Sequence, residues 1–92
     1  MLFEWDPKKS KANQEKHGIG FEAAKILWSD DNRVEIHLLY PVEDRWILIG
    51  KKENKLWTAI FALRGDTIRI ISVRRSREKE VDLYEEKNVR KR

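Results

Sequence analysis

The chain has 92 residues, 39% of them charged, with a formal net charge of +4 and no cysteine. This length predicts one domain over residues 1–92. The lack of cysteine excludes disulfides and thiolate metal sites, and it favours a reducing cytoplasm. We expect no membrane span, because the sequence lacks an apolar stretch of about 18 residues. The acid-containing start does not predict a secretory signal, and two histidines are too few for a histidine-rich metal centre.

The positive charge is unevenly distributed along the chain. Residues 1–63 carry ten basic and ten acidic residues, whereas residues 64–92 carry ten basic and six acidic residues. The whole excess therefore lies in the last third. A basic surface of this kind attracts phosphates or acidic protein segments, and composition does not choose between them.

The chain begins with a short predicted strand and a polar helix. Residues 2–5 alternate apolar and polar side chains, as a strand does. Asp6 is a good N-cap and Pro7 suits the first position of a helix over residues 7–17, which Gly18 ends. This helix is almost wholly polar, so we expect polar contacts or a partner to hold it.

A second helix, better buried than the first, is predicted over residues 21–28. Phe21, Ala24 and Trp28 recur at helical spacing and share one face. The polar residues 29–32 end this helix.

Four strands should follow, because apolar and polar residues alternate between turn signals. They are expected over residues 33–40, 45–51, 56–64 and 67–74. The last two strands are separated by Gly65-Asp66, which predicts a two-residue hairpin. The result is an antiparallel meander.

The hairpin register decides which arginines share a face of the sheet. A two-residue turn places Leu63 opposite Ile68 and Trp57 opposite Arg74. In that register Arg64 and Arg69 lie on one face, and Arg74 begins on the other. They can form one site only if strand twist or a β-bulge near Ser72 brings Arg74 round to join them.

The last predicted element is a helix over residues 76–87. Ser76 is a fair N-cap, and Glu80 lies in the first turn, where the helix dipole favours acids. The basic tail, residues 88–92, is expected to fray. The order β-α-α-β-β-β-β-α predicts an α+β fold with helices on one face of the sheet.

A cluster of arginines is the main candidate for a binding site. Five of them fall within fourteen residues: Arg64, Arg69, Arg74, Arg75 and Arg77. Guanidinium groups bind phosphate through paired N–H donors and stay charged, so a nucleic-acid surface is one interpretation. The alternative is that these side chains pair with nearby acids or lie in water.

Several other polar residues admit a catalytic or a structural interpretation. His17, next to Lys16 at a helix end, could act as a general acid or base in RNA cleavage, or could cap its own helix. His37 is expected to be structural or solvent-facing. Glu4 could orient a basic catalytic group, and Tyr84 suits a core position with its hydroxyl at the rim.

Two end segments together resemble a known family. The segments "FEWDPKK…N..KHGIGFEAA" and "RGDTIRIISVRRSREKEVDLYEE" resemble those of BrnT toxins, the ribonuclease halves of bacterial type II toxin–antitoxin pairs. The similarity covers nearly the full length and is weakest over about residues 29–58. It implies a RelE-like fold, with two N-terminal helices and a C-terminal helix on a small antiparallel sheet. It also implies RNA cleavage without a metal or other cofactor, translation arrest, and a DNA-binding, BrnA-like antitoxin that lets the complex repress its operon.

The resemblance also marks individual positions. Matching motif positions are Trp5, Asp6, Asn13, Lys16, His17, Gly18, Phe21, Glu22, Arg64, Arg69, Ser72, Arg74 and Tyr84. Our hypothesis gives catalytic roles to His17, Lys16, Arg64, Arg69 and Arg74, and RNA contacts to Arg75, Arg77 and Tyr84. The alternative is a non-catalytic module that binds an antitoxin within a DNA-binding repressor.

Overall fold

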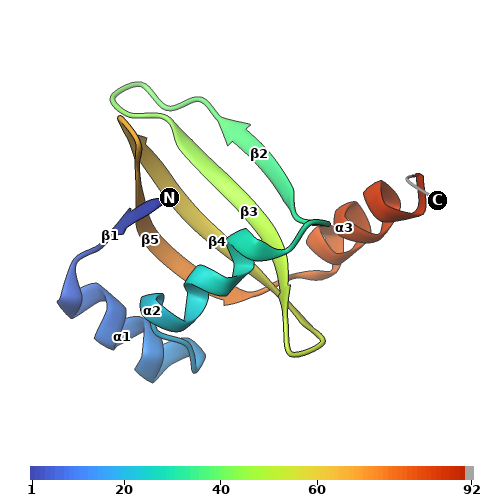
Figure 1. Ribbon diagram of the computed structural model, residues 1–92, viewed down its shortest axis with the longest axis horizontal. Coiled ribbons are helices and arrows are strands. Elements are labelled where there is room, and N and C mark those ends of the chain that lie inside the picture. Colours follow the sequence, from blue (N-terminus) through green and yellow to red (C-terminus); the bar gives the residue numbers. More distant parts are fainter. Residues whose placement is uncertain (91–92) are drawn as a thin grey trace.

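The computed structural model describes residues 1–90 and has the expected α+β class (Figure 1). Its elements are β1 (Leu2–Glu4), α1 (Pro7–His17), α2 (Phe21–Ala24), the 3-10 helix η1 (Lys25–Ser29), β2 (Val34–Leu38), β3 (Arg45–Lys52), β4 (Lys55–Arg64), β5 (Thr67–Arg75) and α3 (Glu78–Arg90). Helices α1 and α2 lie together against one face of the sheet, whereas α3 extends outward beyond β2 and β3 (Figure 1). The prediction that the helices share one sheet face is wrong for α3, because its residue Glu80 contacts Thr58 and Arg74, which point away from the core. Within residues 1–90, no helix is both long and apolar enough to cross a membrane.

The sheet has five strands in the order β1-β5-β4-β3-β2. Strands β2 to β5 form the predicted antiparallel meander. The prediction of a wholly antiparallel sheet is wrong, because β1 pairs with β5 in parallel. A three-residue strand carries no sequence signal for its direction. Its direction is set by packing, since Phe3 contacts Trp28 edge to face with ring centroids 5.2 Å apart.

The core lies between the sheet and the layer formed by α1, α2 and η1. Its buried residues are Ile19, Phe21, Ala24, Leu27, Trp28, Leu48, Ala59, Phe61, Ile68, Ile70 and Val73. The expected helix over residues 21–28 forms as α2 followed by η1. Gly50 lets η1 lie directly on β3, because a Cβ atom there would be 3.0 Å from the Leu27 carbonyl oxygen.

Helix α1 is held by polar contacts, as its composition predicted. Asp6 caps it by accepting a hydrogen bond from the Lys8 N–H, and Gly18 ends it in the left-handed conformation. The buried amide of Asn13 donates to the Ile19 and Val73 carbonyls at 2.8 Å each. Its oxygen accepts from the Val73 N–H at 3.1 Å. One asparagine therefore joins α1 to β5.

The β4–β5 hairpin contains a bulge that changes the predicted register. Near the turn, Leu63 pairs with Ile68 as expected. Beyond Phe61 the register shifts by one residue, so Arg74 pairs with Thr58 and not with Trp57. The predicted Trp57–Arg74 pairing is therefore wrong, and the bulge turns Arg74 toward the face that carries Arg69.

Helix α3 begins two residues later and ends later than predicted. Val81 donates its N–H to the Arg77 carbonyl, and Glu80 accepts from the Arg77 N–H at 2.7 Å, so Arg77 is the N-cap. Ser76 does not cap the helix, because its hydroxyl lies 2.8 Å from that of Thr58. The helix continues to Arg90, so part of the tail expected to fray is helical. The rest of that tail, residues 91–92, lies outside the described residues.

Candidate functional site

One face of the sheet, opposite α1 and α2, carries four arginines that we call the arginine face. They are Arg45, Arg64, Arg69 and Arg74. Side chains alternate along a strand, so neighbours of core residues point away from the core. Ile70 and Phe61 are buried in the core, which places Arg69 and Arg64 on the far face, as the hairpin predicted. Arg45 was not predicted from the sequence to join this face, on which it lies because its neighbour Trp46 packs on the core side.

Each arginine of this face contacts a carboxylate. Arg69 Nη1 lies 2.6 Å from Glu4 Oε2. Glu43 joins two arginines, with Oε2 2.6 Å from Arg45 Nη1 and Oε1 3.4 Å from Arg64 Nε. The Arg64 side chain is 54% exposed, so it has the most room for a ligand among the paired arginines of this face.

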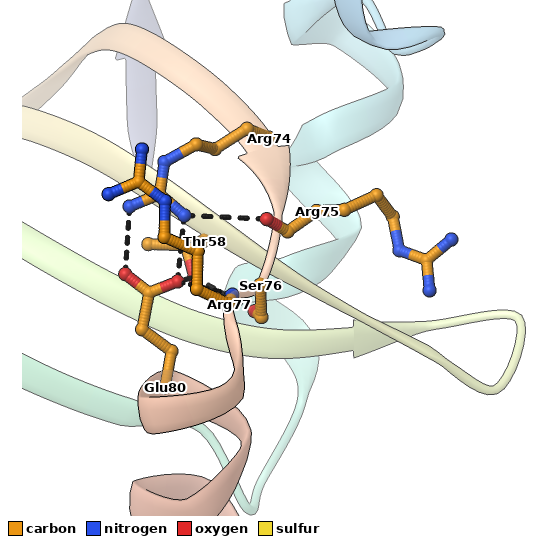
Figure 2. Close-up of polar contacts among 6 residues, drawn as sticks. All are labelled: Thr58, Arg74, Arg75, Ser76, Arg77 and Glu80. Carbon is orange, nitrogen blue, oxygen red and sulfur yellow. Dashed lines mark hydrogen bonds and ion pairs between the residues drawn. The ribbon is translucent and has the colours of Figure 1, made fainter.

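Arg74 is fixed by a two-pronged ion pair with Glu80 (Figure 2). The two terminal nitrogens of Arg74 donate to the two carboxylate oxygens at 2.7 and 2.8 Å. Glu80 also accepts from the Thr58 hydroxyl at 3.0 Å and from the Arg77 N–H at 2.7 Å. The hydrogen bond from Arg74 lowers the pKa of Glu80 to about 2, against the opposing effect of burial. Arg74, only 18% exposed, therefore fastens α3 to the sheet.

Arg75, one of the expected RNA contacts, does not join this face. Figure 2 shows the Arg75 guanidinium directed away from the Arg74–Glu80 pair. That guanidinium lies 5.5 Å from the ring centroid of Trp57, in a cation–π contact. Arg77 is exposed at the start of α3. Arg75 and Arg77 thus lie at the end of β5 and at the start of α3.

Tyr84, another expected RNA contact, is only 6% exposed. Its hydroxyl donates to Asp30 Oδ2 at 2.8 Å. Burial, together with this hydrogen bond, raises the pKa of Tyr84 to about 12. The structural interpretation of Tyr84 therefore accounts for its position.

His17 and Lys16 lie in the last turn of α1. That helix packs on the face of the sheet opposite to Arg64 and Arg69. The structure therefore brings three of the proposed catalytic arginines to one face and leaves His17 and Lys16 on the other layer.

The contact of His37 with a carboxylate was not predicted from the sequence. His37 Nε2 lies 2.8 Å from Asp44 Oδ2, and the imidazole stacks on Trp46 with ring centroids 4.4 Å apart. His37 and Asp44 line an open pocket of about 540 Å³, and Tyr40 and Glu43 line it as well. The strand register pairs His37 with Trp46, but the Asp44 contact depends on the path of the loop over residues 39–44.

Fold and site together define a small basic α+β protein with an arginine face suited to phosphate groups. A family model described as "Ribonuclease toxin, BrnT, of type II toxin-antitoxin system" matches residues 5–80. The chain therefore belongs to the BrnT family of ribonuclease toxins, as its end segments predicted. Membership gives ribonuclease activity as the general function and implies an antitoxin partner. A search of curated proteins finds no significant match.

Proposed function

We propose that this protein is a metal-independent endoribonuclease with a RelE-like fold, whose cleavage of RNA arrests translation. The arginine face is the observation that carries the proposal, together with the family. Arg64 and Arg69 occupy diagonal positions on paired strands, which separates their Cβ atoms by roughly 7–8 Å. This spacing suits contacts with one phosphate or with neighbouring phosphates of a single strand.

The arginines would act on the charge that develops during cleavage. Attack of a ribose 2′-oxygen on the adjacent phosphate places extra negative charge on the non-bridging oxygens. A positioned guanidinium stabilises that charge more than it stabilises the bound RNA, which lowers the barrier. Arg64 is better placed for this role than Arg69, because its side chain is more exposed. Its contact with a carboxylate is also longer, at 3.4 Å from Nε to Glu43 Oε1.

The test is cleavage of RNA, free and ribosome-bound, by the purified protein in EDTA. Arg64→Ala should lower the cleavage rate on the order of 100-fold, the usual effect of losing one charge-stabilising donor. Lys9→Ala is the matched control, because it removes one positive charge from an exposed position on α1. Intact RNA under every condition with the wild-type protein would refute the enzymatic function.

Exposed apolar side chains offer the antitoxin partner a docking surface on this chain. Four apolar side chains that we call the apolar rim lie exposed around the β2–β3 loop and the end of β4: Leu39, Tyr40, Val42 and Leu63. Exposed apolar groups gathered in this way mark protein-binding sites. We propose that a BrnA-like, DNA-binding antitoxin covers this rim, and that the complex reaches operator DNA through the antitoxin.

A non-catalytic, antitoxin-binding module is the second candidate function. The pairing of each arginine of the face with a carboxylate favours this binding module, because guanidinium groups already bound to carboxylates are less available to RNA phosphates. Growth arrest on expression, relieved by co-expressed antitoxin and lost in Arg64→Ala, would support the enzyme. Antitoxin binding without growth arrest would support the binding module.

A further inference from the structure

His37 and Asp44 form the arrangement that orients a histidine as a general base. An ionised carboxylate only accepts hydrogen bonds, so the ring nitrogen that faces Asp44 Oδ2 at 2.8 Å, Nε2, carries the proton. In the neutral ring the other nitrogen, Nδ1, then holds a free lone pair. Stacking on Trp46, with an interplanar angle of 14°, fixes the plane of the ring.

The pocket beside this pair is joined to the arginine face through Glu43. His37, Asp44 and Glu43 all line the pocket. The Glu43 carboxylate contacts Arg45 at 2.6 Å and Arg64 at 3.4 Å. His37 lies on the same sheet face as its strand partner Trp46, opposite to Arg45 and Arg64, so Glu43 at the end of the sheet links the oriented imidazole to the guanidinium groups of the other face.

We propose that His37 is the general base of RNA cleavage, with Asp44 as its positioning residue; this assignment deepens the proposed ribonuclease function and depends on it. His37 Nδ1 takes the proton from a ribose 2′-hydroxyl. The 2′-oxygen forms a bond to the adjacent phosphorus as the bond from phosphorus to the 5′-oxygen breaks. The leaving 5′-oxygen takes a proton from water, and the protonated His37 gives its proton to the hydroxide that remains, so the products are a 2′,3′-cyclic phosphate and a 5′-hydroxyl end.

This assignment replaces His17 as the base. Neither histidine lies on the arginine face: His17 is in the last turn of α1, and His37 is paired across the strands with Trp46, which packs on the core side. His37 has a carboxylate partner, a stacking partner and an open pocket beside it. The charged and titratable groups that line the pocket around His37 are Asp44, Glu43 and Tyr40.

The two histidines of the chain are natural matched controls for each other. Single-turnover cleavage of one RNA would be measured for wild type, His37→Gln and His17→Gln across pH 5 to 9. His37→Gln should cleave on the order of 100-fold more slowly, with RNA binding unchanged and the acid limb of the pH–rate profile lost. His17→Gln should keep the wild-type rate and profile, and imidazole in the buffer should partly restore His37→Ala.

Each outcome decides between distinct claims. Cleavage by His37→Gln at the wild-type rate, or loss of the acid limb in His17→Gln alone, would overturn the role of His37 and leave the ribonuclease function intact. A wild-type protein that cleaves no RNA would overturn the proposed function and this assignment together. Circular dichroism of each variant separates loss of chemistry from loss of fold.

Discussion

Glu80 shows how a single residue organises one end of the sheet. Its carboxylate accepts hydrogen bonds from Arg74, Thr58 and the Arg77 backbone, and so joins β5, β4 and the start of α3. Its side chain is 15% exposed, so water competes weakly for these bonds. Removing one partner would leave a mostly buried charge unpaired, which is costly.

Glu80→Gln should make the free energy of unfolding vary less with pH in the acid range. The folded-state pKa of about 2 lies below the ordinary value of 4.5, so the pairing stabilises the fold fully above pH 4.5 and loses this effect as pH falls toward 2. The difference corresponds to on the order of 3 kcal/mol. Urea unfolding of Glu80→Gln should show a loss of this size at pH 7 and a flatter profile between pH 4.5 and 2. The exposed first-turn variant Glu78→Gln is the control and should follow wild type; an unchanged pH profile in Glu80→Gln would contradict the role of the pair.

Asn13 is the second residue with a disproportionate effect on stability. Asn13→Asp keeps the size of the side chain and can still accept from the Val73 N–H, but it cannot donate to the Ile19 and Val73 carbonyls. We expect a loss of about 3 kcal/mol or more in the free energy of unfolding, because two buried carbonyls would face a carboxylate. Thermal unfolding of the variant and of the wild type measures this loss. Gln14→Glu, an exposed change of amide to acid on the same helix, should have little effect.

At the scale of elements, α3 is attached by polar contacts at both of its ends. Its first turn holds Glu80, and its later turns reach the loop before β2. Tyr84 donates to Asp30, and Asn88 donates to the Asn32 carbonyl at 3.1 Å. Burial acts to raise the pKa of Asp30, but hydrogen bonds from the Asn32 and Lys51 backbones and from Tyr84 lower it overall. Asp30 therefore stays charged and anchors the helix.

Tyr84→Phe separates the structural interpretation of this residue from the RNA-binding one. The variant should lose about 1 kcal/mol of stability, the usual net value of one hydrogen bond, while RNA cleavage and RNA binding stay at wild-type levels. Ultraviolet titration should lose the tyrosine step near pH 12 in this variant. Tyr40→Phe should retain that step. Weaker RNA binding with unchanged stability would favour a role in RNA contact.

The elements could largely be predicted from the sequence, because their signals are local. Asp6-Pro7, Gly18 and Gly65-Asp66 mark ends and turns by their own backbone preferences. The sequence raised a bulge near Ser72 only as a condition, since its formation depends on how β5 packs against α1 through Val73 and Asn13. The face of Arg74 follows from that bulge.

The candidate site was predictable only where strand alternation decides it. Arg64 and Arg69 lie close to the hairpin turn, before the bulge, so counting along the strands placed them correctly. The pairing of His37 with Asp44 needs a loop to close over a strand end, which no periodic pattern reveals. Motif position alone likewise did not reveal that Tyr84 is buried and donates a hydrogen bond to Asp30.

At the scale of the whole molecule, the two sheet faces have different roles. One is covered by α1, α2 and η1 and holds the core, while the other carries the arginines. The apolar rim lies at the end of the sheet that also holds the His37 pocket, since Tyr40, Val42 and Leu63 line that pocket. An antitoxin that covers the rim would therefore close the pocket as well, so that binding and neutralisation become one event.

Leu39→Lys should weaken antitoxin binding without changing RNA cleavage by the free toxin. Leu39 is 80% exposed and belongs to the rim. Losing its burial in the complex removes about 1.5–3 kcal/mol, which raises Kd at least about tenfold. Isothermal titration calorimetry with the antitoxin measures this change. Ile26→Lys is the matched control, because Ile26 is 53% exposed but lies on η1, in the helical layer. Unchanged affinity in Leu39→Lys with weaker binding in Ile26→Lys would place the antitoxin on the helices instead, where it would leave the pocket open.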